Sequence, residues 1–281
     1  MHNHNPKVGL IILNYNTWQL TIKEIENIHN TLIYDNYKII IVDNQSTNDS
    51  VKQLKQYQLK SKVAFDIIIS SKNSGYAAGN NIGIKRSIEC KCKYSFILNN
   101  DILFTDKNTL KDVVDYMETH PNVGALSPRI MSLNGKHDKP IYYRRPSFWD
   151  LFLGYPAFVH GKMTQDDMLI YPVYAPRGSC MIIVNDILRQ IGYLDESTFL
   201  YYEEPILGEQ LYKLKKEVIN YGAHYVIHNH AETIKKNVPN KQILNFMIDS
   251  MHIYLSKYRK FTNLECWLCK KTRQVTYLLR H

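Results

Sequence analysis

The stretch Tyr37-Lys38-Ile39-Ile40-Ile41-Val42-Asp43 contains four apolar residues in a row and ends in an acid. An apolar run without alternating polar residues is typical of a strand that is buried on both faces of a sheet. Val8–Leu13 before it, and Phe65–Ile69 and Tyr94–Leu98 after it, have the same character. Stretches with a helical pattern separate these runs, at about residues 17–32, 44–59, 75–89 and 107–120. This alternation predicts an α/β fold whose mostly parallel central sheet is flanked by helices.

Polar side chains follow two of these predicted strands. Asp43 ends the second strand, and Asn99-Asn100-Asp101 follows the fourth. In parallel sheets of this kind, ligands bind beyond the carboxyl ends of the strands. Asp43 is therefore a candidate for hydrogen bonds with a nucleoside, and Asp101 for a hard divalent cation that bridges two phosphates. The alternative is that each acid serves only as a helix cap or turn residue.

A glycine-rich segment, Lys72–Gly83, lies between the third predicted strand and the helix after it. Its three glycines allow the backbone to approach a ligand closely. The segment matches neither the dinucleotide-binding fingerprint nor a P-loop, so those two classes lack their signature. The alternative is a turn followed by a small-residue packing face of a helix.

Two further sets of titratable residues stand in the second half of the chain. Glu203 and Glu204 precede Pro205, which suits the first turn of a helix, and the helix dipole favours ionised acids there. A carboxylate in that position can take a proton from an acceptor hydroxyl. His228 and His230 end the last predicted strand on one face and are candidates for the same metal as Asp101. The alternatives are capping acids and ordinary surface or core histidines.

Length and composition fit one large α/β domain with an appendage. The chain has 281 residues and a formal net charge of +9, with 44% hydrophobic and 22% charged residues. Residues 231–281 hold ten Lys/Arg and three acids, so this tail carries +7 of the net charge. A basic tail indicates an anionic partner. Because the tail matches no nucleic-acid-binding module, we expect no nucleic acid partner.

The sequence predicts a cytoplasmic location. The first residues are polar, and no run of about 18 apolar residues occurs, so neither a signal peptide nor a transmembrane helix is expected. The five cysteines are an odd number, which favours a reducing compartment. Cys266-x-x-Cys269 lacks a second pair, so a structural zinc site is not expected.

The basic tail is also patterned for a helical extension. Ile243, Met247, Met251 and Tyr254 recur at helical spacing, and a later stretch combines Trp267 and Leu278 with several cations. Apolar residues beside clustered cations suit the surface of an anionic membrane. The alternative is a helical pair that packs on the core or on a second subunit, as in a homo-oligomer.

Taken together, these motifs resemble the family 2 glycosyltransferases of the GT-A fold, in particular the rhamnosyltransferase-like branch that builds capsule or exopolysaccharide. The resemblance covers about residues 7–230, and the motifs stand in the order and spacing of the family. They are Leu13-Asn14-Tyr15-Asn16, Val42–Thr47, Asn73–Gly83, Leu98–Asp101, Gly178–Met181, Gly192–Glu196 and Phe199–Glu204.

The resemblance implies an inverting, metal-dependent transfer of a sugar from a nucleotide-diphosphate donor, a UDP- or dTDP-sugar, to a saccharide or lipid-linked acceptor. It implies Glu204 as the catalytic base, with Glu203 as its neighbour. It implies Mn²⁺ or Mg²⁺ on Asp101, supplemented by His228 or His230. The donor-binding residues that it implies are Asn14, Asn16, Asp43, Asn73, Gly75, Asn80, Asn99, Asn100 and Asp101.

The chain departs from the family pattern at two places. Asn99 replaces the first acid of the usual Asp-x-Asp, which leaves the metal site poorer in charge, and Glu203-Glu204 replaces the usual Glu-Asp. We expect a catalytic domain over residues 1–235, an acceptor side formed by 128–176, and a basic helical extension over 236–281. The competing hypotheses are a non-catalytic nucleotide-sugar binding module on the same fold and a nucleotidyltransferase.

Overall fold

The computed structural model describes residues 6–138, 140, 142–154, 170–229 and 240–278. The first half forms the expected strand–helix alternation. Strands β1 (Val8–Asn14), β2 (Tyr37–Asp43), β3 (Phe65–Ile69) and β4 (Tyr94–Asn99) are parallel and lie in the order β3-β2-β1-β4. Helices α1 (Trp18–Thr31), α2 (Ser50–Lys60) and α3 (Tyr76–Glu89) connect them. The prediction of an α/β fold with a parallel sheet region is thereby confirmed.

The second half extends this sheet with strands of both directions. β9 (Cys180–Val184) is antiparallel to β4 and to β6 (Val123–Ser132), and β10 (Glu217–His228) is parallel to β6. Short strands complete the edges: β5 (Ile102–Phe104) and β8 (Ile170–Val173) pair with β10, and β7 (His137–Asp138) pairs with β6.

Strand β6 is not among the strands that the sequence predicts. In the structure β6 continues through Pro128 to Ser132. A proline cannot donate a ladder hydrogen bond, and strands tolerate it at bulges. The pairing of β10 with β6 shifts its register between Tyr221, opposite Pro128, and Tyr225, opposite Arg129. The sheet accommodates the proline at that irregularity.

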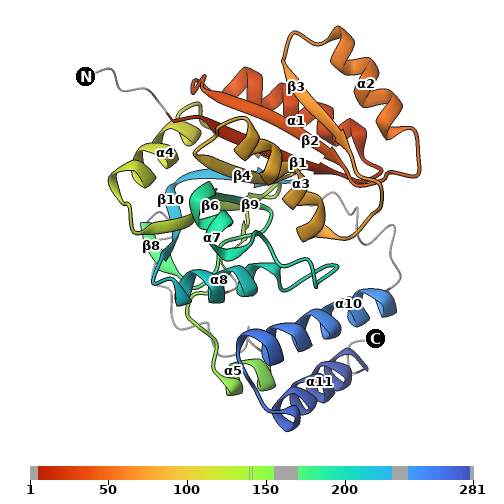
Figure 1. The fold of residues 1–281 in the computed structure, drawn as a ribbon, viewed down its shortest axis with the longest axis vertical. Coiled ribbons are helices and arrows are strands. Elements are labelled where there is room, and N and C mark those ends of the chain that lie inside the picture. The colour runs from red at the N-terminus through yellow and green to blue at the C-terminus, as the bar shows by residue number, and fades with distance from the viewer. Residues whose placement is uncertain (1–5, 139, 141, 155–169, 230–239, 279–281) are drawn as a thin grey trace.

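Helices cover both faces of the sheet (Figure 1). One core cluster joins the sheet to α1, α2 and α4 (Thr109–Thr119), with Ile25, Leu54 and Val113 fully buried. The other cluster joins the opposite face to α3, α7 (Asn185–Ile191) and α8 (Glu203–Lys213). Burial of branched residues on both faces explains the continuous apolar runs of the sequence.

The tail is helical, as expected, and comprises α10 (Asn240–Ile253), a π-helical turn η1 (Tyr254–Tyr258) and α11 (Asn263–Leu278). Together with α5 (Phe148–Leu153), which a capping box on Ser147 begins, these elements pack against α8 through a third apolar cluster. In Figure 1 they form a layer on the side of α8 that faces away from the sheet.

The structure bears on two expectations for the tail. Met251 and Tyr254, which were candidates for a membrane-facing stripe, are buried in the cluster with α8, as are Cys266 and Cys269. The predicted domain boundary at residue 235 lies outside the described residues, so the division at 1–235 and 236–281 stays a prediction. No helix in the described part of the chain is both long and apolar enough to cross a membrane.

Candidate active site

One part of the candidate site is built around Asp43 at the end of β2. This carboxylate is fully buried and accepts hydrogen bonds from Asn14 Nδ2 (2.7 Å), Ser46 N (2.8 Å) and Ser46 Oγ (2.7 Å). Asn16 Oδ1 accepts from Thr47 N at 2.8 Å. The structure therefore brings the predicted residues Asn14, Asn16 and Asp43 together at the carboxyl ends of β1 and β2.

The glycine-rich segment lies against this group. Asn44 Nδ2 donates to Asn73 Oδ1 (2.9 Å) and to the Gly75 carbonyl (3.2 Å), which joins the loop after β2 to the start of α3. Asn80 is buried, and its Nδ2 donates to the Tyr76 carbonyl at 3.0 Å. Asn73 and Gly75 therefore lie beside the Asp43 group, whereas the amide of Asn80 bonds the first turn of its own helix.

Gly75 connects this region to the predicted base. Its φ of +95° favours glycine, and an added Cβ would lie 2.2 Å from the Phe199 carbonyl oxygen. The next residue, Tyr76, donates its backbone N–H to that same carbonyl at 2.9 Å. The chain before Glu203 is thus held directly against the chain before α3, although more than a hundred residues separate them.

Asp101 lies at the turn between β4 and β5, beside the end of β10. Its Oδ1 is 3.2 Å from His228 Nε2, and both side chains are largely buried. Asn100 turns the other way, because its Nδ2 donates to Thr17 Oγ1 (2.7 Å) and Thr21 Oγ1 (3.0 Å) on the α1 side. Asn99 is half-buried at the end of β4. His230 lies outside the described residues.

The pair Asp101–His228 fits a divalent cation in part. An oxygen and a nitrogen 3.2 Å apart are compatible with neighbouring ligands of one ion. In the described ranges, no group of three or more His, Cys, Asp or Glu side chains is arranged to hold a metal. A cation bound here would therefore take most of its remaining ligands from phosphate oxygens and water, which is how Mg²⁺ is commonly held.

Glu24 on α1 is a titratable residue that the sequence analysis missed. It is fully buried, and within the described residues neither carboxylate oxygen has a hydrogen-bond partner. Burial raises the pKa of Glu24 well above its usual value, and the charge of Asp101 adds to the rise. Burial thus disfavours a second negative charge close to Asp101. An acid within an amphipathic helical pattern gives no signal of this placement.

Glu203 and Glu204 begin α8, as expected, but their surroundings differ. Glu203 is buried, and its Oε1 lacks a hydrogen-bond partner among the described residues. Burial raises the pKa of Glu203 to about 8, and the neighbouring Glu204 contributes to the rise. Glu204 is partly exposed, and its Oε1 accepts a hydrogen bond from the Gly178 N–H at 2.9 Å.

The Gly178 peptide links the two halves of the candidate site. The Tyr76 hydroxyl donates a hydrogen bond to the Gly178 carbonyl oxygen, and the Gly178 N–H donates one to the Glu204 carboxylate. The following residue, Ser179, accepts a hydrogen bond from Asn99 N at 2.9 Å. Glu204 is thereby placed near the strand end that carries Asp101. In the sequence, Gly178 and Tyr76 stood out only as members of motifs, and neither was assigned a role.

Arg177 adds a cation to the same segment. Its guanidinium forms an ion pair with Asp138, and its side chain is 13% exposed. Nε and Nη1 are buried without a hydrogen-bond partner among the described residues. Two spare donors on a partly desolvated guanidinium can bind an anionic oxygen, which makes Arg177 a candidate binding residue.

The fold is of the GT-A type found in glycosyltransferases, and the family comparison agrees with it. The model of "Glycosyl transferase family 2" matches residues 10–190. The chain therefore belongs to glycosyl transferase family 2, as the sequence motifs indicated.

Individual relatives support the same family. The low-salt glycan biosynthesis hexosyltransferase Agl10 of Haloferax volcanii is 30% identical over 222 residues, which is 78% of this chain and 65% of that protein. An uncharacterized glycosyltransferase of Rickettsia bellii is 32% identical over 114 residues, 41% of this chain and 15% of its own. The chain thus spans less than two thirds of the length of these relatives.

Solved structures share the fold. The mannosyltransferase PcManGT from Pyrobaculum calidifontis, in complex with GDP-Man and Mn²⁺, has a TM-score of 0.63 at 14% identity, covering 97% of this chain and 74% of its own. GalNAc-T7 with UDP, GalNAc and Mn²⁺ has a TM-score of 0.66 at 13% identity, covering 97% and 55%. At such identities the likeness concerns the fold alone.

Proposed function

We propose that this protein transfers a sugar with inversion from a nucleotide-diphosphate donor to a hydroxyl of a saccharide or lipid-linked acceptor. The observation that carries the proposal is that three sets of predicted site residues lie near one another at the carboxyl end of one sheet. Asp43 lies at the nucleoside end, Asp101 with His228 at the diphosphate, and Glu204 on Gly178 beside them. Family membership supports the reaction class.

Glu204 acts as the general base in this proposal. It is the partly exposed member of the pair, whereas the pKa of Glu203 is raised to about 8 by burial, so Glu203 holds a proton at neutral pH. Glu204 takes the proton of the acceptor hydroxyl while that oxygen attacks the anomeric carbon from the face opposite the nucleotide. One displacement of this kind inverts the anomeric configuration.

Asp101 and His228 would hold a divalent cation, Mn²⁺ or Mg²⁺, which supplies charge neutralisation for the departing nucleotide diphosphate. The structural neighbours with Mn²⁺ support this part of the proposal. Asp43 and Asn14 orient the nucleoside, and the backbone of the Asn73–Gly75 turn lies close to them. We expect the described parts of residues 128–176, including Arg177's partner Asp138, to lie on the acceptor side.

The proposal extends to the polysaccharide product and to the location of the protein in the cell. A relative named for glycan biosynthesis supports a role in building a surface polysaccharide such as capsule or exopolysaccharide. We place the protein in the cytoplasm, at the inner face of the membrane where a lipid-linked acceptor is available. The donor that we propose is a UDP- or dTDP-sugar, although the neighbours bind GDP-Man in one case and UDP in the other.

The surface for that membrane contact is the outer face of α11. Leu264, Trp267, Val275 and Leu278 recur at helical spacing and are 52–75% exposed. Lys271 lies on the same stripe, with its Nζ 5.9 Å from the Trp267 ring. Exposed apolar residues beside cations are suited to the interface of an anionic membrane. The opposite face of α11, with Cys266 and Cys269, packs on the protein.

A donor panel tests the proposed reaction. Nucleotide release from UDP-, dTDP- and GDP-sugars is measured with and without Mn²⁺, using the wild-type protein and Glu204→Gln. We expect release from one donor class that depends on Mn²⁺ and on Glu204. Tight donor binding without release in the presence of any acceptor would instead support a non-catalytic binding module.

A further inference from the structure

The loop from Asp195 to Tyr202, which leads into Glu203, is held by the C-terminal extension. The Phe199 and Phe246 rings lie 4.6 Å apart, centroid to centroid. Ser250 Oγ donates to the Leu200 carbonyl at 2.9 Å, and Lys257 Nζ pairs with Asp195 Oδ2 at 2.7 Å. Side chains from α10 and η1 thus contact the loop at its start and close to its end.

The Asp195 carboxylate that pairs with Lys257 also accepts hydrogen bonds from other side chains. Burial alone would raise the pKa of Asp195, but hydrogen bonds from Lys257, Ser197 and Tyr258 lower it to about 2. The carboxylate therefore stays ionised at all ordinary pH values. Its two partners in η1 fix the start of the loop to the extension.

The end of the loop has an unfavourable backbone conformation. Tyr201 and Tyr202 both have positive φ, 72° and 67°, which non-glycine residues rarely adopt. Such a conformation persists only where the surroundings hold it, and it is most often found at functional sites. The Tyr202 ring packs on Tyr254 with centroids 5.7 Å apart, and Tyr254 is fully buried. These two strained residues directly precede the Glu203–Glu204 pair.

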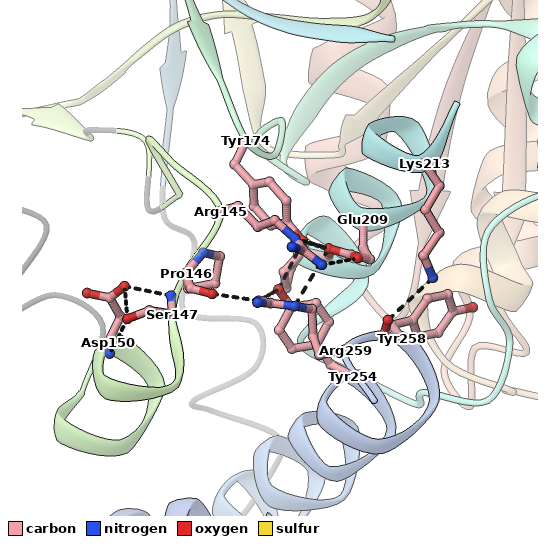
Figure 2. A network of polar contacts seen from close by, with 11 residues as sticks. Arg145, Pro146, Ser147, Asp150, Tyr174, Glu209, Lys213, Tyr254, Tyr258 and Arg259 are labelled. Atoms are coloured by element: carbon pink, nitrogen blue, oxygen red, sulfur yellow. Dashed lines mark hydrogen bonds and ion pairs between the residues drawn. The ribbon is translucent and has the colours of Figure 1, made fainter. Parts of the chain in front are cut away.

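A polar network anchors Tyr254 itself, as Figure 2 shows. Its hydroxyl is 3.0 Å from the Tyr174 hydroxyl and accepts from Arg259 Nη1 at 3.0 Å. Tyr174 donates to Glu209 on α8 at 2.6 Å, and Arg145 binds the same carboxylate through two nitrogens, at 2.9 and 2.6 Å. Tyr254 therefore stands between the strained loop and a charged network on the helix that carries the proposed base.

The backbone at Tyr254 is also unusual. Tyr254–Tyr258 forms a π-helical turn, which is rare and occurs frequently at functional sites. This turn supplies Tyr254 to the network and Lys257 and Tyr258 to Asp195. The irregular turn of the extension and the irregular backbone of the loop are thus joined to each other.

We infer that the C-terminal extension is a positioning element for catalysis, and that Phe246, Ser250 and Tyr254 hold the 195–202 loop so that Glu204 is presented on the Gly178 peptide. These three residues contact the loop from the extension, whereas the start of α3 contacts it through the Phe199 carbonyl. They act through the loop and are not expected to contact the donor. The inference rests on the proposed role of Glu204 as base.

The test uses Phe246→Ala and Ser250→Ala in the full chain. Phe246 is partly exposed and the serine change is small, so we expect the melting temperature to fall only slightly. We expect kcat for sugar transfer to fall about 10-fold or more, because misplacement of a catalytic group by about 1 Å costs rate steeply. The donor Kd should stay unchanged. Hydrogen–deuterium exchange of the 195–204 amides should become faster.

Two further variants serve as controls. Phe246→Tyr keeps the ring and should retain the wild-type kcat. Asn245→Ala changes an exposed side chain next to Phe246 on α10 and should change neither kcat nor exchange. Wild-type kcat and wild-type exchange in Phe246→Ala and Ser250→Ala, with Glu204→Gln inactive, would overturn the inference. Full activity of Glu204→Gln, with faster loop exchange in the two alanine variants, would instead contradict the proposed base.

Discussion

Glu203 and Glu204 are neighbours in the chain but differ in burial, and the roles proposed for them follow from this difference. Glu204→Gln retains an oxygen that can accept from Gly178 N, so the loop should keep its structure. We expect kcat to fall about 10²-fold or more, the usual scale for loss of a general base, with little change in donor Kd. Steady-state kinetics and calorimetric titration of the donor measure the two effects.

The control for this change is Glu89→Gln, which alters a largely exposed acid at the end of α3. Its kinetics should match those of the wild type. An active Glu204→Gln together with an inactive Glu203→Gln would show that the assignment within the pair is wrong.

Glu203 should make stability depend on pH. Its folded-state pKa is about 8, against an ordinary value of 4.5, so the folded protein retains a proton that the unfolded chain loses between these values. The contribution is complete at low pH and is lost as the pH rises through about 8. The melting temperature of Glu203→Gln relative to wild type should therefore increase steadily from about pH 5 to about pH 9. A difference that is constant with pH would contradict the buried, protonated state.

Asp101 is predicted to be required for the metal-dependent part of donor binding. Asp101→Asn removes the only carboxylate of the Asn99-Asn100-Asp101 turn, so Mn²⁺ should no longer tighten donor binding. The measurement is donor affinity with Mn²⁺ and with EDTA. Asp112→Asn is a matched control, since Asp112 forms a comparable pair with His224 at 2.8 Å away from the candidate site. Unchanged turnover of the wild type in EDTA would refute metal dependence.

At the scale of elements, the segment before β9 lies in close contact with the first turn of α8. A Cβ on Gly178 would lie 3.1–3.4 Å from three atoms of the Glu204 side chain, so Gly178→Ala should displace that carboxylate. We expect a loss of about 10-fold to 10²-fold in kcat with a preserved melting temperature. Wild-type kcat in Gly178→Ala would argue against a fixed position of Glu204.

The same close approach explains why α3 and α8 act as one unit. Tyr76 at the start of α3 and Glu204 at the start of α8 bind opposite ends of the Gly178 peptide. Their helices also share one core cluster on the same face of the sheet. The absence of a Cβ at Gly75 and Gly178 allows these contacts.

At the scale of the whole molecule, the distribution of charge and apolar surface predicts membrane association. The tail carries +7 of the net charge of +9, and the outer face of α11 exposes Trp267 and Leu278. Each basic residue near an anionic surface adds about 1 kcal/mol of attraction. We expect the protein to sediment with anionic but not with neutral liposomes, less so at high salt.

The double variant Trp267→Ser/Leu278→Ser should lose this binding. Leu59→Ser, which changes an 88% exposed leucine on α2, is the matched control and should bind like the wild type. Absence of binding to anionic liposomes at low salt would reject the membrane surface. Concentration-dependent dimers that the double variant abolishes would assign the same stripe to a homo-oligomer.

The sequence by itself determined the strand–helix order of the first half and the strand-end positions of Asp43 and Asp101. It could do so because strands buried on both faces must be continuous apolar runs, and because polar residues that end such runs reach a common edge of the sheet. The resemblance to the family added the prediction of a base at Glu203–Glu204. These are local patterns, and a local pattern can be recognised in the sequence without knowledge of distant contacts.

The tertiary structure decided what depends on contacts across the chain. Only the fold shows that Glu203 is buried while Glu204 accepts from Gly178, that the buried Glu24 is near enough to Asp101 for its charge to act, and that His228 reaches Asp101. It also assigns the apolar residues of α10 and η1 to the protein interior and leaves the outer stripe of α11 exposed. Periodicity marks a face of a helix as apolar. Which neighbour covers that face is set by long-range packing, which no single segment encodes.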